Sequence, residues 1–125
     1  MIQWNYDRER SLILAKYTGA ITFDEISTYI DSLGKIEKLP ARLYILSDFT
    51  EADSKQLYKT KKASKVMHEI KSRMPKYELV KEAILQNSPL VVALSFLYTK
   101  FFAGTPNYRI RVFSTRAAAM EWLGF

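Results

Sequence analysis

The sequence predicts an α/β domain in which four helices flank a five-stranded mixed β-sheet, in the order ββαβαβαβα. The apolar run Leu-Tyr-Ile-Leu at 43–46 is typical of a strand that is buried on both faces. Such a strand needs helices above and below it, and the segments on either side have helical periodicity. Because strands that alternate with helices pair in parallel through right-handed crossovers, most of the expected sheet is parallel.

The chain opens with two strands that we expect to pair as an antiparallel hairpin. Apolar and polar residues alternate over 2–6, and the largely apolar segment 11–18 follows after a short polar turn. The residues Thr22 and Glu25 then form the pattern of a capping box, in which each side chain accepts the other's backbone N–H. Apolar residues at three- and four-residue spacing continue this helix towards Gly34, which is expected at the C′ position.

The central strand is expected over residues 42–48, after which a helix begins with Asp53 or Ser54 as its N-cap. This helix ends at Pro75, because proline disrupts a helix interior. A short strand over 80–86 follows.

The segment 89–103 predicts a helix that is apolar on almost every side, entered through the Ser88-Pro step. A surface helix normally has one polar face, so this one is either covered on most sides or exposes a patch that binds something. The alternating arginines of 109–113 suit a strand with one wet face near a sheet edge. Ser114 or Thr115 then caps a last short helix.

Length and composition indicate a single domain over residues 1–125, of which 48% are hydrophobic. The chain has no cysteine, which excludes a disulfide scaffold and a thiol nucleophile and fits a reducing, cytoplasmic location. The first ten residues lack the pattern of a secretory signal. The uncharged stretch 83–99 falls short of the roughly 20 apolar residues that a spanning helix needs, so we expect no transmembrane segment.

The net charge of +6 is concentrated in the helix predicted over 54–74. Residues 55–76 contain eight Lys or Arg and one acid, Glu69. Such a patch can attract nucleic acid, an anionic membrane surface or an acidic protein, although a solvated helix face is the simpler interpretation. Because its lysines are not interleaved with base-stacking aromatic residues, we expect no sequence-specific nucleic-acid binding.

No set of residues in the chain defines a chemical reaction. The phosphate-binding, dinucleotide, nucleophile-elbow and zinc-protease motifs are all absent, and His68 is the only histidine. The acids Asp48, Glu51 and Asp53 could hold a hard cation, but a loop rich in N-cap residues explains them equally well. We therefore predict a protein that is not an enzyme, with no catalytic residue, no cofactor and no bound metal.

Three segments of the chain resemble the small STAS-like domains related to the sporulation anti-sigma-factor antagonists, the SpoIIAA-like group. They are GAITFDEI before the first helix, AILQNSPLVVALSFLYTKFF, and the closing RVFSTRAAAMEWL. The closing segment matches through Val112, Phe113, Ala118 or Ala119, Trp122 and Leu123. The resemblance covers nearly the whole chain and rests on packing residues. It implies a STAS or SpoIIAA-like fold, similar in architecture to lipid-binding domains of the CRAL-TRIO type.

The same resemblance implies one candidate modification site. The antagonists carry a phosphorylatable serine at the start of the helix after the central strand, and Ser54 stands in the corresponding region. The small residues that follow that serine in the antagonists are replaced here by Lys55 and Gln56. Ser54 is therefore a phosphorylation candidate, and an N-cap role explains it as well.

For function, we expect a non-enzymatic regulatory module that binds a protein partner and forms a homodimer through helix 89–103. The alternative is a small carrier that holds a lipid or other apolar ligand beside the same helix. Aromatic residues anchor interfaces and line apolar pockets, so the helix supplies four candidate binding residues. Two polar candidates stand at the carboxyl end of the central strand, where α/β sheets usually meet their ligands. These six candidates are Phe96, Tyr98, Phe101, Phe102, Asp48 and Thr50.

Overall fold

The structure is a computed structural model that describes residues 1–53, 62–73, 76–88, 105 and 107–125. The elements along the chain are β1 (Ile2–Asp7), β2 (Leu12–Ala20), α1 (Phe23–Gly34), β3 (Arg42–Asp53), α2 (Lys62–Arg73), β4 (Leu79–Leu85), β5 (Tyr108–Phe113) and α4 (Arg116–Leu123). All five predicted strands are present, and three of the four predicted helices are described. The fourth, predicted over 89–103, lies outside the described residues.

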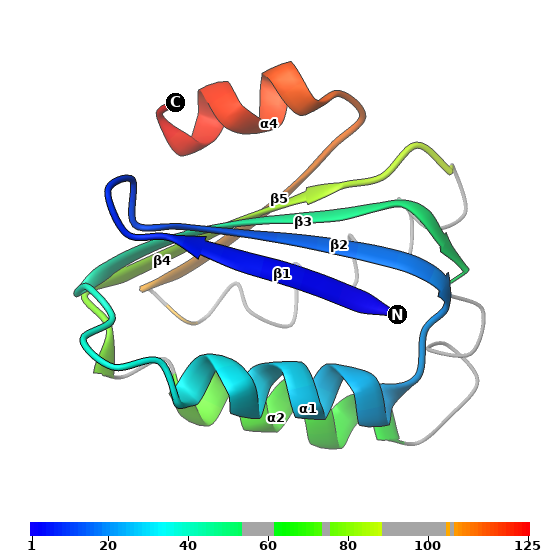
Figure 1. The fold of residues 1–125 in the computed structure, drawn as a ribbon, viewed down its shortest axis with the longest axis horizontal. Coiled ribbons are helices and arrows are strands. Elements are labelled where there is room, and N and C mark those ends of the chain that lie inside the picture. Colours follow the sequence, from blue (N-terminus) through cyan, green and yellow to red (C-terminus); the bar gives the residue numbers. More distant parts are fainter. Residues whose placement is uncertain (54–61, 74–75, 89–104, 106) are drawn as a thin grey trace.

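The five strands form one mixed sheet in the order β1-β2-β3-β4-β5. The hairpin β1–β2 is antiparallel, and every other pair is parallel. The central position of β3 and the edge position of β5 confirm the predictions made from their apolar and alternating patterns. The helices cover the sheet from both sides, with α1 and α2 on one face and α4 on the other (Figure 1).

Side chains alternate along β3 and enter two separate cores. Leu43 and Ile45 join the core beneath α1 and α2, which also receives Ile70 of α2. Leu46 points the other way and packs with Leu123 of α4. Burial on both faces explains why this strand reads as an uninterrupted apolar run.

The strand β3 is longer than the predicted 42–48. Its last residues pair with the end of β2, from Thr18–Glu51 to Ala20–Asp53, after an irregularity between Lys16 and Thr18. Asp48, predicted as the last residue of the strand, therefore lies well inside it. Thr50, predicted just beyond the end, also lies within the strand, which corrects its predicted position. On the face covered by α1 and α2, the rings of Phe49 and Tyr17 stack with their centroids 3.9 Å apart, and this contact stabilises the extension.

The capping box at the start of α1 is confirmed. The Glu25 N–H donates to the Thr22 hydroxyl at 3.2 Å, and the Thr22 N–H donates to the Glu25 carboxylate at 3.0 Å. The prediction for Gly34 is wrong, because Gly34 is the last helical residue and Lys35 is the C-cap. A Cβ on Gly34 would stand 3.0 Å from the guanidinium of Arg73, so a larger residue there would require that side chain to shift slightly.

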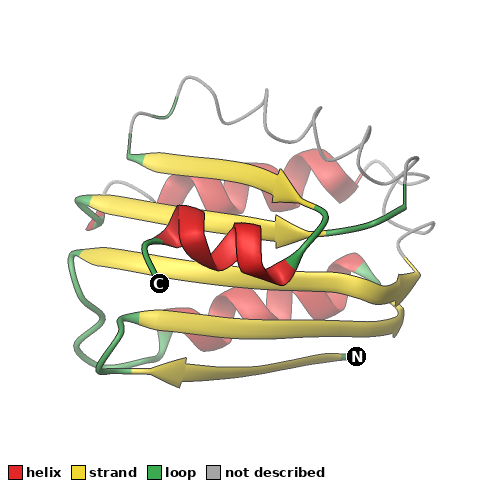
Figure 2. Ribbon diagram, turned by 90° about the horizontal axis from the view of Figure 1, so that it is seen from above, coloured by secondary structure: helices red, strands yellow, loops and turns green. Residues whose placement is uncertain are grey.

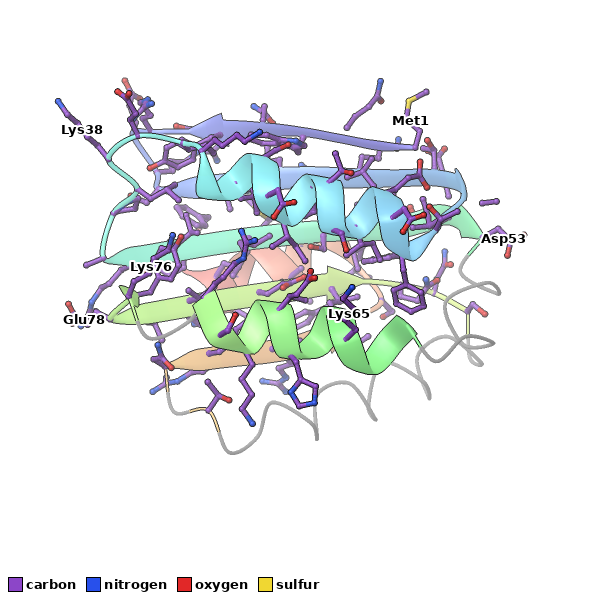
Figure 3. All side chains as sticks on the ribbon, turned by 90° about the horizontal axis from the view of Figure 1, so that it is seen from below. Met1, Lys38, Asp53, Lys65, Lys76 and Glu78 are labelled. Atoms are coloured by element: carbon purple, nitrogen blue, oxygen red, sulfur yellow. The ribbon has the colours of Figure 1, made fainter. Side chains whose placement is uncertain are left out.

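Arg73 joins the two helices on that face. Its guanidinium donates to the Asp31 carboxylate at 2.5 Å and to the Ile30 carbonyl at 3.1 Å. Figure 3 shows α1 and α2 lying side by side across the sheet. Lys65 of α2 is exposed, which confirms that the basic side of this predicted helix faces solvent. Lys61, predicted on the same side, lies outside the described residues.

The final helix α4 has Thr115 as its N-cap, with the Ala118 N–H donating to the Thr115 hydroxyl at 3.3 Å. It ends at Gly124, whose left-handed φ of 97° suits glycine. Ala119 and Leu123 are its buried residues, so Ala119 and not Ala118 makes the contact expected from the resemblance. No helix among the described residues is long and apolar enough to cross a membrane.

Leu46→Ala tests the two-sided burial of β3. Leu46 is 1% exposed, so removing its side chain should lower the free energy of unfolding by about 2–5 kcal/mol. Chemical denaturation measures the loss, with Thr28→Ala on the exposed face of α1 as the control. Equal stabilities of the two variants would show that Leu46 is not a core residue.

Candidate functional site

The structure brings together two of the six predicted binding residues. The Asp48 carboxylate accepts hydrogen bonds from the Thr50 hydroxyl at 2.6 Å and from the Thr50 N–H at 2.9 Å. The four aromatic candidates Phe96, Tyr98, Phe101 and Phe102 lie outside the described residues, as does Ser54. Asp48 and Thr50 are consequently the predicted positions around which a site can be built.

Asp48 belongs to a group of charged side chains over β2 and β3. Lys16 forms an ion pair with Glu51 at 2.7 Å. The hydrogen bond and charge of Glu51 raise the pKa of Lys16; Asp48 raises it further, whereas Arg116 opposes both. Two cations and two acids are thus gathered where β2, β3 and the start of α4 meet.

An open hollow of about 350 Å³ lies beside these charges. Residues of β1, β2, β3 and α4 line it: Gln3, Trp4, Asn5, Leu14, Ala15, Lys16, Leu46, Asp48 and Arg116. Leu46 is buried and Leu14 is half-buried, whereas Lys16 and Arg116 are exposed. We call this feature the β2–β3 hollow; its apolar residues are bordered by charges of both signs.

The position of α4 explains why the hollow exists. This helix of eight residues lies over the middle of the sheet and leaves β1 and part of β2 uncovered on that face (Figure 2). It packs on β3, β4 and β5 through residues such as Leu123 and Trp122. A longer helix or a second one would be needed to cover the remaining strands.

Arg116 is the first residue of α4, and the first turn contains no acidic side chain. The N-terminus of a helix carries partial positive charge, so a cation there is electrostatically unfavourable. Among the described residues, no carboxylate forms an ion pair with Arg116. The charge of Arg116 is therefore placed against the local preference of the helix and at the border of the β2–β3 hollow.

A second polar group lies on the opposite face of the sheet, in the core beneath α1 and α2. The Glu82 carboxylate on β4 accepts hydrogen bonds from the Ser47 hydroxyl at 2.8 Å and from the Tyr108 hydroxyl at 2.5 Å. The hydroxyl of Tyr17 on β2 interacts with Ser47, which slightly opposes the effect of burial on the Tyr17 pKa. Four adjacent strands thus each contribute one polar side chain to a line across the sheet.

Burial controls the protonation of this line. Removal from water raises the pKa of Glu82 above its ordinary value, and the hydrogen bonds from Tyr108 and Ser47 partly oppose this rise. Burial also raises the pKa of Tyr17, with a further contribution from the charge of Glu82. Sequence reasoning missed the line because its members lie far apart in the chain; the charged pair Lys81-Glu82 inside an apolar strand was the available signal.

The side chain of Lys81, next to Glu82 in β4, points to the face of the sheet that α4 covers. Its ammonium donates to the Trp122 carbonyl at 2.6 Å and lies 4.3 Å from the centre of the Trp122 ring. Burial and then the charge of Arg109 lower the pKa of Lys81. These contacts of Lys81 stabilise the packing of α4 on β4, so its role is structural.

Gln86, the residue after β4, also has a role that sequence reasoning missed. It is 2% exposed, and its side-chain amide donates to the Phe49 carbonyl at 3.3 Å. Its side-chain oxygen accepts from the backbone N–H groups of Asn87 at 3.0 Å and Ser88 at 3.1 Å. Gln86 therefore ties the loop after β4 to β3 and satisfies backbone groups that would otherwise lack partners.

Comparison with known proteins locates this architecture. No family model matches the chain, and no curated protein matches it. Among solved structures, it is similar to an uncharacterised DUF3478-family protein from Shewanella loihica PV-4, described as having a SpoIIAA-like fold. The two chains are 19% identical, the match covers 98% of this chain and 92% of that one, and the TM-score is 0.61.

This chain has a SpoIIAA-like fold. The resemblance found in the opening and closing segments of the sequence is thereby confirmed for the fold. At 19% identity the similarity supports nothing about activity, since one fold serves many functions.

Glu82→Gln tests the buried carboxyl through pH. The folded protein holds the Glu82 proton to higher pH than the unfolded chain does, so wild-type stability should fall as pH rises through that interval. Glutamine keeps an acceptor and cannot ionise. The melting temperature of the variant, minus that of the wild type, should therefore increase between about pH 4 and about pH 8.

Thermal unfolding at several pH values measures this difference, with Glu121→Gln on the exposed side of α4 as the control for removing a carboxylate. A difference for Glu82→Gln that stays constant across the pH range would contradict a raised pKa.

Proposed function

We propose that this chain is a non-enzymatic regulatory module that binds a protein partner at the β2–β3 hollow. The observation that carries the proposal is a hollow that the half-buried Leu14 lines and charged side chains border, on the part of the sheet that α4 leaves uncovered. Apolar groups surrounded by a polar border are the ordinary anatomy of a protein-binding surface.

The chemistry of the hollow favours a protein over a small molecule. Small-molecule sites are mostly enclosed and apolar, with few polar groups. The β2–β3 hollow is open, and Lys16, Asp48 and Arg116 place both signs of charge around its apolar residues. A protein segment can supply an apolar side chain together with complementary charges, and electrostatic complementarity of this kind selects the partner.

The placement of Arg116 supports the same proposal. A cation at the start of α4 costs stability, whereas an acidic residue there would add to it. Residues that break a local rule of stability are often retained for function. Arg116 is accordingly the residue of the hollow that we assign to an acidic side chain of the partner.

The carrier function, with an apolar ligand beside helix 89–103, remains the alternative. Its four aromatic residues fall outside the described residues, so they stay predictions. Native mass spectrometry of the purified protein separates the two functions, because a carrier would retain a ligand of discrete mass and a protein-binding module would not.

Arg116→Glu should stabilise the fold while weakening partner binding. Replacing the cation by an acid at the N-terminus of α4 should raise the free energy of unfolding by about 0.3–1 kcal/mol. Ala117→Glu, at the next and also exposed position, is the matched control, because it adds the same favourable charge and keeps Arg116. Denaturant titration measures both. If Arg116→Glu lowered the free energy of unfolding and Ala117→Glu did not, Arg116 would instead be a residue that stabilises the fold.

Site-specific photo-crosslinking tests the binding surface itself. A photoreactive amino acid at position 117, next in the chain to Arg116 of the hollow, should yield a discrete protein adduct in cells that make the full chain. The same amino acid at position 28, on the exposed side of α1, should not. The adduct should be lost when Arg116→Glu is added. Equal adducts at both positions, or none at position 117, would count against partner binding at the hollow.

A further inference from the structure

The strand β1 forms one edge of the sheet, and its outer side is uncovered in the described part of the chain (Figure 2). The paired inner side is fixed by two hydrogen bonds at its start. The Met1 nitrogen donates to the Thr18 carbonyl at 2.7 Å, and the Thr18 N–H donates to the Met1 carbonyl at 2.9 Å. Met1 and Thr18 are therefore a hydrogen-bonded pair of the antiparallel ladder.

This pair sets the direction of every backbone group along β1. Hydrogen-bonded and non-hydrogen-bonded pairs alternate in an antiparallel ladder, so Gln3 and Asn5 direct their N–H and C=O groups towards β2. Ile2, Trp4 and Tyr6 direct theirs outward. Three residues of β1 thus present a row of backbone donors and acceptors at the open edge.

β1 has few of the features that normally protect an edge strand, and its charged residue is Asp7 at the last position. Its sequence IQWNYD contains no proline, lysine or arginine, and its register with β2 has no bulge. The opposite edge strand, β5, carries the exposed Arg109 and Arg111. Of the two edge strands, β1 therefore has fewer features that oppose pairing with another strand.

We propose that β1 pairs antiparallel with β1 of a second copy of this chain, about a two-fold axis at Trp4. The two sheets then form one continuous sheet. This inference goes beyond the proposed function and does not depend on it. It differs from the dimer predicted through helix 89–103, because the contact is made by the strand β1.

The register of β1 is what selects a second copy as the occupant. A two-fold axis at Trp4 places residue n opposite residue 8 − n, so Ile2 faces the partner's Tyr6 and Trp4 faces the partner's Trp4. The three residues with outward backbone groups meet each other, and each pair can exchange both hydrogen bonds. No charged side chain lies between Ile2 and Tyr6, so no like-charge contact opposes the pairing.

The side chains on both faces agree with this register. Ile2, Trp4 and Tyr6 are half-buried, and Trp4 lies 6.0 Å from the ring of Tyr29 on α1. The partner strand would cover their outer sides and extend this core. On the other face, the exposed Gln3 would stand opposite the partner's Asn5, next to the β2–β3 hollow that both residues line. The partner would then border the hollow, and the dimer would present two hollows on one face.

A pair of charged variants tests the axis. Gln3→Glu with Asn5→Glu places like charges opposite each other twice across the axis, which should raise the dimer dissociation constant about tenfold. Gln3→Glu with Asn5→Lys places opposite charges there and should dimerise at least as well as the wild type. Both positions are exposed, so both variants should fold. Sedimentation equilibrium from micromolar to millimolar protein measures the constants.

Hydrogen exchange gives a second readout that folding alone does not change. Exchange of the Ile2, Trp4 and Tyr6 amides should slow as protein concentration rises, whereas exchange of the Gln3 and Asn5 amides should not. A wild-type protein that stays monomeric at millimolar concentration would overturn the proposal. So would a dimer to which both charged variants are indifferent, or one abolished by Phe101→Glu with no change in exchange along β1.

Discussion

The burial of β3 on both faces is the constraint on which the rest of the structure depends. Leu43 and Ile45 require cover from α1 and α2, while Leu46 requires cover from α4 on the opposite face. Right-handed crossovers between parallel strands supply such cover. Because α4 has only eight residues, it meets this need over β3 and β4 without reaching β1. The short helix that closes this core therefore also leaves the β2–β3 hollow open.

The two faces of the sheet treat buried polarity differently. Beneath α1 and α2, burial raises the pKa of Glu82, and the hydrogen bonds from Tyr108 and Ser47 oppose that rise without a cation in the hydrogen-bonded line. On the α4 face, charges stay near solvent, and Lys16 and Glu51 pair at the border of the hollow. Exposed pairs of this kind contribute little to stability, which leaves them free to serve recognition.

The similarity to another SpoIIAA-like structure at 19% identity illustrates what a fold preserves. The residues behind the resemblance, such as Phe113, Trp122 and Leu123, pack α4 against the sheet. Packing positions constrain size and polarity, so they carry the architecture between distant sequences. The charges around the hollow are not part of that pattern, and function has to be argued from them directly.

Local patterns in the sequence determined most of the architecture. The capping box of Thr22 and Glu25, the N-cap Thr115 and the apolar run at 43–46 act through residues close together in the chain, so pattern alone reveals them. Asp48 was also found, although the length of β3 was underestimated because its extension depends on pairing with the distant end of β2. Tertiary structure alone decided which side chains meet. Glu82 joins Ser47 and Tyr108, and Arg116 reaches the border shared with Lys16, because strands distant in sequence lie side by side in the sheet.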